Sequence, residues 1–252
     1  MQPIEQNNVR LAATVLLVRD KKPGSVEIFM VQRPGRVDFP DLHVFPGGKV
    51  DEADFLPDLC NGIDDEIASR LLGVSAGGLR SWVAVIRECF EEAGVLLADR
   101  HGVPIDFNDR AEIEHIASHR SQLIDGTMSF GEFCQAEGLS LACDRTLYFS
   151  HWITPEAAPR RFDTRFFLAP MPAGQEAIAH EWETEGGCWI TPEMALSNHK
   201  KGAWQMISPT LITLEMVSAY DDMDSLFKAV LAEEHYPDLT TDRRFQGMHP
   251  LR

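Results

Sequence analysis

The stretch RECFEEAGV, residues 87–95, decides how this sequence is interpreted. It closes a longer segment, residues 80–93, in which apolar side chains recur at the spacing of one helix face. The apolar stripe consists of Trp82, Val85, Ile86, Cys89, Phe90 and Ala93. Gly94 is well placed to end the helix, because glycine adopts the left-handed backbone of a helix cap at no steric cost. We therefore predict an amphipathic helix that packs on a core through this stripe.

A second face of the same helix carries three carboxylates. Glu88, Glu91 and Glu92 stand at positions i, i+3 and i+4 and therefore share one patch. Like charges at this spacing repel by roughly 0.2–0.5 kcal/mol per pair, and no lysine is interspersed to relieve them. Clustered carboxylate oxygens are what hard divalent cations bind. Taken alone, the patch leaves two interpretations open, a metal site and a solvated acidic face.

The surrounding pattern resembles the Nudix box. Residues 87–95 match the helical half of that box, R-E-U-x-E-E-x-G-U, at every fixed position. Gly48, within the string FPGG, matches the opening glycine, and Asp54 stands where the box has its first glutamate. The usual seven-residue spacer is replaced by residues 55–86. The box therefore contains an insertion of about 25 residues, which we expect in a surface loop.

The chain is accordingly similar to the Nudix hydrolases, and most to the branch with a long insertion in the box, which includes the peroxisomal acyl-CoA diphosphatases. Two stretches outside the box, residues 152–167 and 189–192, look like the same branch. The resemblance implies an α+β Nudix fold, a mixed β-sheet sandwiched between α-helices. The expected organisation is a single Nudix domain over residues 1–252, with insertions at about 55–79 and, helical, at about 100–145, and C-terminal helices at about 209–232 followed by a tail.

The remaining segments mix strands and helices without a strict βαβ rhythm, which also favours an α+β fold. The expected strands are residues 11–19, 26–32, 147–153, 165–169 and 188–190. The expected helices are residues 65–72, 109–137 with a break at Gly126, 192–200, 209–220 and 225–231.

The resemblance implies that water attacks a P–O–P bond in a nucleoside diphosphate linked to another moiety. Mg²⁺ or Mn²⁺ would neutralise the phosphates and lower the pKa of bound water. Glu91 and Glu92 are the expected core ligands, and Glu88 is a ligand or the general base. Arg87 is expected to orient these groups as an ion pair. Gly48 is expected to let the backbone approach the metal closely.

Further site residues are predicted outside the box. Glu183 is the expected additional metal ligand, with Glu185 as the neighbouring alternative. Guanidinium forks suit phosphate. Three arginines are therefore candidates for substrate binding: Arg33, Arg161 and Arg165. The alternative is that Asp163 simply pairs with the last two of them.

Two histidines receive a different interpretation. His115 and His119 stand at i and i+4 in an expected helix, with Glu112 three residues ahead of the first. The sequence lacks the HExxH arrangement of helical zinc sites. We therefore interpret the pair as surface or packing histidines.

The overall charge limits the partners. The chain has 252 residues and a formal net charge of −16, which argues against a protein that grips nucleic-acid phosphates or an anionic membrane. Its partner is expected to be a small nucleotide diphosphate, and a homodimer is expected at the level of the family. The five cysteines contain no CxxC pair, which is typical of reduced thiols in a cytoplasmic protein.

Three functions remain open. The leading hypothesis is metal-dependent hydrolysis of a pyrophosphate bond, with CoA or acyl-CoA as the substrate. An ADP-ribose or dinucleotide pyrophosphatase is the alternative within the same chemistry. A Nudix-fold module that senses a nucleotide without turnover is the alternative from another class, although a sensor has no need of three mutually repelling carboxylates.

Overall fold

The structure is a computed structural model, and it describes residues 4–6, 9–21, 24–33, 41–105, 107, 109–158, 160–179 and 186–232. The strands are β1 (Glu5–Gln6), β2 (Val9–Lys21), β3 (Ser25–Gln32), β4 (His43–Val44), β5 (Gly47–Lys49), β6 (Ala98–Arg100), β7 (Val103–Pro104), β8 (Leu139–Leu141), β9 (Leu147–Ile153), β10 (Arg161–Pro170) and β11 (Gly187–Ile190). The α-helices are α1 (Asp65–Leu72), α2 (Leu79–Ala93), α3 (Arg110–Ile124), α4 (Phe130–Ala136), α5 (Pro192–Lys200), α6 (Ser208–Val217) and α7 (Met223–Leu231).

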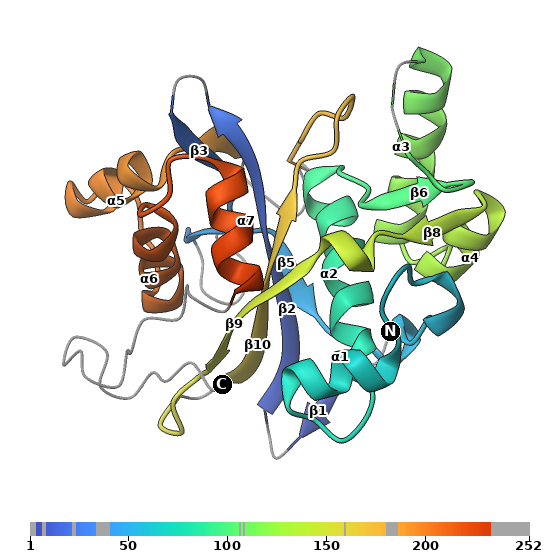
Figure 1. Ribbon diagram of the computed structural model, residues 1–252, viewed down its shortest axis with the longest axis horizontal. Helices are drawn as coiled ribbons and strands as arrows, with labels where there is room; N and C mark the ends of the chain where they lie inside the picture. The colour runs from blue at the N-terminus through green and yellow to red at the C-terminus, as the bar shows by residue number, and fades with distance from the viewer. Residues whose placement is uncertain are drawn as a thin grey trace.

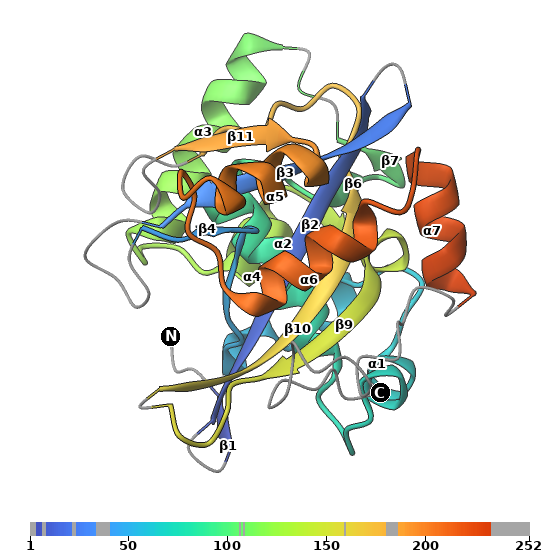
Figure 2. The same cartoon turned by 90° about the vertical axis from the view of Figure 1, so that its left-hand side faces the viewer.

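A mixed sheet runs through the middle of the molecule in the order β11-β3-β2-β10-β9 (Figure 1). β2 pairs in parallel with β10 on one edge and antiparallel with β5 and then β3 on the other. Helices cover both faces of the sheet. α1 to α4 lie on one side, and α5, α6 and α7 lie on the other. In Figure 2, α5 and α6 lie in front of the sheet and α7 lies to the right of β9. This is the α+β sandwich that the sequence predicts.

β2 is a nearly continuous apolar run because both of its faces are buried. Val15 and Leu17 belong to the core beneath α2, whereas Leu16 and Val18 belong to the core beneath α5 to α7. The alternation follows from the two-residue period of a strand. The sheet therefore separates two apolar cores, and only the first of them supports the acidic helix.

The apolar stripe of α2 packs on this first core as predicted. The Trp82 ring lies 4.8 Å from the ring of Phe167 on β10, and its indole nitrogen donates a hydrogen bond of 2.8 Å to the carbonyl of Thr146. Full burial of a side chain such as Phe167 stabilises the fold by about 1.5–3 kcal/mol. The opposite face of α2 is thereby fixed towards β5 and the loop that follows it.

The insertion within the box docks onto the start of α2. Asp65, the first residue of α1, accepts hydrogen bonds from the backbone nitrogens of Gly77 (2.9 Å) and Leu79 (3.0 Å). Backbone N–H groups at a helix start have no partner within the helix, so this carboxylate satisfies groups that would otherwise be open. The extra residues are thus accommodated without displacing the helix.

Several boundaries differ from the sequence-based expectations. The helical stretch expected over residues 109–137 consists of two helices, α3 and α4, and residues 125–129 between them include the expected break at Gly126. The insertion expected to be helical also contains strands, because β7 and β8 pair with β6 in a small second sheet. Strands of two or three residues are too short to leave a periodic signal.

The helices that the structure describes are all too short or too polar to span a membrane.

Candidate active site

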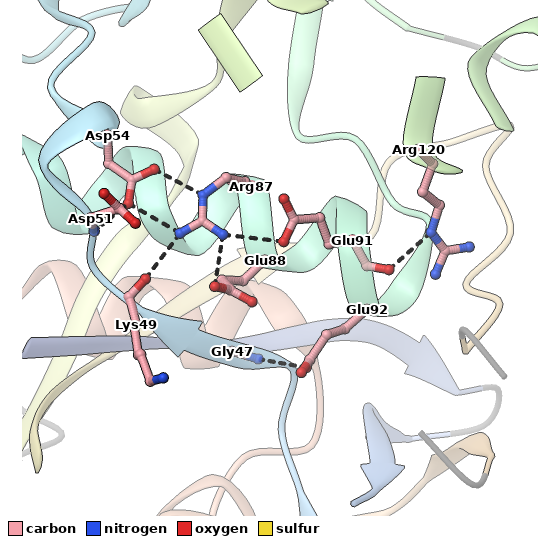
Figure 3. Close-up of polar contacts among 9 residues, drawn as sticks. All are labelled: Gly47, Lys49, Asp51, Asp54, Arg87, Glu88, Glu91, Glu92 and Arg120. Atoms are coloured by element: carbon pink, nitrogen blue, oxygen red, sulfur yellow. Dashed lines mark hydrogen bonds and ion pairs between the residues drawn. The ribbon is translucent and has the colours of Figure 1, made fainter. Parts of the chain in front are cut away.

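The acidic face of α2 lies against β5 (Figure 3). The backbone nitrogen of Gly47 donates a hydrogen bond of 2.8 Å to Oε2 of Glu92. A Cβ atom on Gly48 would lie 2.4–2.6 Å from the carboxylate atoms of Glu88, closer than real Cβ contacts occur. The backbone of Gly47 and Gly48 therefore lies directly against two of the three predicted carboxylates, Glu92 and Glu88.

Arg87 is the centre of the hydrogen-bond network. Its side chain is buried, and its five N–H groups are all used. The acceptors are Asp54 Oδ1 (2.9 Å) and Oδ2 (3.1 Å), the Lys49 carbonyl (2.9 Å), Glu88 Oε1 (2.7 Å) and Glu91 Oε2 (3.1 Å). Burial alone would lower the pKa of Arg87, but the surrounding carboxylates outweigh it and hold the pKa well above its usual value. Arg87 thus fixes two carboxylates of the acidic face, as the sequence predicts.

Asp54 has a definite place in this network. It is 2% exposed and holds Arg87 through both carboxylate oxygens. The short helix Glu52–Asp54 delivers it, and the backbone nitrogen of Asp51 donates to its Oδ2 at 2.8 Å. An aspartate therefore takes the position of the first glutamate of the box, as an orienting partner of Arg87. The sequence pattern aligned Asp54 with this position, but its orienting role could be inferred only from its contact with Arg87.

The donor set fits a divalent cation. Asp54, Glu88, Glu91 and Glu92 carry four formal negative charges against the one positive charge of Arg87, which leaves −3 for these five side chains. Glu88 and Glu91 have side chains that are only 13% and 8% exposed. Carboxylates gathered at such low exposure require compensating charge. All the donors are oxygens, which is the ligand type of Mg²⁺ and Mn²⁺.

The C-terminal end of α2 is clamped by a residue that the sequence did not single out. Gly94 ends the helix in the left-handed conformation, with φ 69°. Arg120 on α3 donates a hydrogen bond of 3.0 Å to the backbone carbonyl of Glu91 and one of 3.1 Å to the carbonyl of Ile178. α3 therefore holds the helix at the level of its acidic residues. No local pattern marks Arg120, because its partners lie 29 and 58 residues away.

The cysteine beneath the acidic face is inert. Cys89 is fully buried, and burial together with the charge of Glu92 raises its thiol pKa far above its usual value. All five cysteines are free thiols, and Cys89, Cys134 and Cys143 are buried. Reactivity of a cysteine requires its thiolate, so these buried thiols serve packing.

Arg165 faces the same side of the sheet as Gly48 but is already paired. Arg165 lies opposite Ala13 on β2, and Ala13 lies opposite Gly48 on β5, so the three residues form one row across the sheet. Arg165 is 7% exposed and forms a close ion pair with Asp163, whose Oδ1 also lies 2.6 Å from Nε2 of His151. The alternative interpretation, pairing with Asp163, therefore describes the arrangement of Arg165.

The other predicted binding residues lie apart from this network. Arg161 donates a hydrogen bond of 3.1 Å to the carbonyl of Thr154, at the hairpin end of β10. Arg33 directly follows β3 and is half-buried. Neither belongs to the network around Arg87 in Figure 3. Glu183 and Glu185 lie outside the described residues.

The known proteins that this chain is similar to are all Nudix proteins. The family model of the NUDT19 Nudix domain matches residues 77–216. Acyl-coenzyme A diphosphatase NUDT19 from Xenopus laevis is 24% identical, over 91% of this chain and 66% of its own length. The protein of the same name from Gallus gallus is 24% identical, over 82% of this chain and 65% of its own length. A putative nudix hydrolase 7 from Caenorhabditis elegans is 26% identical, over 78% of this chain and 57% of its own length.

The chain thus spans less than two thirds of the length of the curated relatives it matches. A crystal structure of a NUDIX hydrolase from Alicyclobacillus acidocaldarius shares the fold, with a TM-score of 0.73 at 24% identity. That similarity covers 87% of this chain and 96% of the other.

Proposed function

This chain belongs to the NUDT19 Nudix domain family, and from that premise we propose that it is an enzyme that hydrolyses the pyrophosphate bond of CoA or an acyl-CoA. Nudix hydrolases generally use divalent metals, and Mg²⁺ or Mn²⁺ is the ion proposed here. The observation that carries the proposal is the acidic face of α2. Glu88 and Glu92 lie against the Gly47–Gly48 backbone, and Arg87 orients Glu88 and Glu91.

The roles of the residues follow from their contacts. A divalent metal, when bound, supplies charge neutralisation for the diphosphate and a water of lowered pKa. Glu88, Glu91 and Glu92 would hold it through carboxylate oxygens, and one of them would take the proton of the attacking water. Arg87 keeps Glu88 and Glu91 in one orientation, so no reorganisation is needed when charge develops. Gly48 would leave room for the metal beside Glu88.

The substrate is proposed from the relatives, two of which are named acyl-coenzyme A diphosphatases. CoA contains a diphosphate and a further phosphate, so arginines are expected to bind it. Arg33 and Arg161 stay predicted for this role, since neither is engaged at the centre of the site. Arg165 would take part only by exchanging its contact with Asp163. Glu183 stays a predicted metal ligand.

The test is a substrate panel with the full chain and Mg²⁺ or Mn²⁺: CoA, an acyl-CoA, ADP-ribose, NADH and diadenosine polyphosphates, with released monophosphate as the readout. CoA or acyl-CoA is expected to turn over, and chelation with EDTA is expected to stop it. Glu91→Gln and Glu92→Gln are expected to lower kcat at least about 100-fold with the fold intact. Glu215→Gln, an exposed glutamate on α6 across the sheet, is the matched control.

The other outcomes discriminate the alternatives. Full activity of both glutamine variants would place the site elsewhere. Preference for ADP-ribose or a dinucleotide would replace the CoA proposal but keep the chemistry. Tight binding without turnover of any compound would indicate a sensing module. The homodimer and the cytoplasmic location stay predictions, to be tested by light-scattering mass and by cell fractionation.

A further inference from the structure

A second cluster of ligand-type side chains lies away from the acidic face of α2. His115 and His119 are one turn apart on α3, and Glu137 directly follows α4. Nε2 of His115 is 2.8 Å from Oε1 of Glu137, and Nδ1 of His119 is 3.7 Å from the same oxygen. One ligand atom from each residue lies within 4.8 Å of the other two. Side chains from two successive turns of α3 and from the end of α4 therefore converge on one point.

The convergence fits the size of a zinc site. Zinc binds imidazole nitrogen and carboxylate oxygen at about 2.0–2.2 Å, so the donor atoms around a tetrahedral ion are about 3.3 Å apart. The present separations need adjustments of roughly an ångström, and His115 can supply them because its side chain is 56% exposed. His119 is pre-positioned, since its side chain is 13% exposed and packs on the Phe133 ring at 5.3 Å.

One nitrogen in this cluster lacks a conventional partner. Nδ1 of His119 is buried and makes no hydrogen bond among the residues that the structure describes. A buried polar atom without a partner costs about 1–3 kcal/mol. It points to the same carboxylate oxygen as His115, at a distance suited to sharing a metal and too long for a hydrogen bond.

The surroundings orient the carboxylate and favour a cation. Arg100 on β6 donates a hydrogen bond of 2.8 Å to Oε2 of Glu137, which leaves Oε1 facing the two histidines. Arg100 also forms a close ion pair with Glu112 on α3. With neutral imidazoles, the two carboxylates and one guanidinium sum to −1. Such outer contacts are typical of metal sites, where they fix the direction of a ligand.

We propose that His115, His119 and Glu137 form a Zn²⁺ site with a fourth position open to water, distinct from the carboxylates of α2. The site would join α3 to the end of α4. Both helices contact α2 through other residues: Phe133 stacks on Phe90 at 5.2 Å, and Arg120 binds the carbonyl of Glu91. Zinc would therefore brace the scaffold that supports the acidic helix.

The test is a zinc titration of the full chain against a chromogenic chelator, in excess Mg²⁺ to occupy the α2 carboxylates. One equivalent of zinc is expected to bind. The double variant His115→Ala/His119→Ala is expected to lose that equivalent, and Glu137→Gln to weaken it at least about tenfold. His199→Ala, a histidine on α5 across the sheet, is the matched control and is expected to bind as the unaltered chain does. Circular dichroism without zinc checks that each variant is folded.

Cobalt substitution identifies the ligands. Co²⁺ at this site is expected to show visible d–d bands without a sulfur-to-cobalt charge-transfer band, because no cysteine takes part. Zinc is also expected to raise the Tm of the unaltered chain and not that of the double variant. The proposal would be overturned if the unaltered chain bound no zinc in excess Mg²⁺, if the folded double variant kept its equivalent, or if a thiolate band appeared.

Discussion

Arg87 shows how much of the site depends on one side chain. Its guanidinium joins Asp54 from the short helix before the insertion to Glu88 and Glu91 on α2. The contact with Asp54 spans 33 residues, so it holds the two parts of the interrupted box together. Lysine cannot replace this function, because it lacks a planar fork that reaches several acceptors at once.

We expect Arg87→Ala to lower the free energy of unfolding by about 3–5 kcal/mol, since removing one partner of a buried pair leaves uncompensated charge. Arg87→Lys is expected to recover part of the loss. Urea denaturation measures both. Arg110→Ala is the control, because the exposed Arg110–Glu114 pair is worth only about 0.3–0.5 kcal/mol. A loss below about 1 kcal/mol for Arg87→Ala would contradict a structural role for the network.

At the scale of elements, the approach of β5 to α2 and β2 depends on two neighbouring glycines with different surroundings. A Cβ on Gly47 would meet the backbone of β2, with the Ala13 carbonyl oxygen at 2.4 Å and the Thr14 Cα at 2.6 Å. The three atoms nearest to a Cβ on Gly48 would all belong to the carboxylate of Glu88, the far end of a flexible side chain. Strand pairing constrains the first glycine and the site constrains the second.

Alanine substitutions are therefore expected to separate folding from metal binding. Gly47→Ala should destabilise the chain by at least about 1–3 kcal/mol, because backbone must shift to relieve the overlap. Gly48→Ala should leave the unfolding free energy nearly unchanged but weaken Mg²⁺ or Mn²⁺ binding by displacing Glu88. Urea denaturation and metal-dependent kinetics measure the two effects. Equal loss of stability in both variants would show that Glu88 cannot move aside.

At the scale of the whole molecule, the sheet divides the structure into two layers, and buried charges tie its strands together. Asp163 and Arg165 on β10 and His151 on β9 form one such cluster beneath the α2 layer. Burial alone would raise the pKa of Asp163, but His151 and Arg165 outweigh it and lower the pKa below its usual 3.8. The negative charge of Asp163 therefore stabilises the folded state.

Because of this cluster, the free energy of unfolding is expected to depend on pH in the acid range. A carboxylate with a lowered pKa contributes its stability above the unfolded pKa, and the contribution is lost as the pH falls through the folded pKa. We expect Asp163→Asn to be less stable at pH 7 and to show a flatter fall of unfolding free energy below a pH of about 4. Urea denaturation as a function of pH measures this. An acid limb as steep as that of the unaltered chain would contradict it, and exposed Asp221→Asn is the control.

The local sequence was sufficient to predict the acidic helix and to identify the family. The apolar stripe and the three glutamates of α2 follow from the helical period within 15 residues, and both faces are placed as predicted. The expected strands β2, β3, β9 and β10 are long enough to show runs of apolar residues, so they were also predictable. The short strands of the second sheet were not, because pairing with distant segments, more than local propensity, stabilises them.

Contacts between distant residues were decided only by the tertiary structure. The sequence left open the role of Asp54. It also left open whether Arg165 binds substrate or pairs with Asp163. Both questions depend on which side chains lie within contact distance in the folded chain. The sequence also showed two histidines at helical spacing but not Glu137, which lies 22 residues after His115. Spacing along the chain predicts which side chains lie next to one another on a single helix or strand. Which elements meet is determined by burial of their apolar faces, and the polar contacts on the opposite faces follow from that packing.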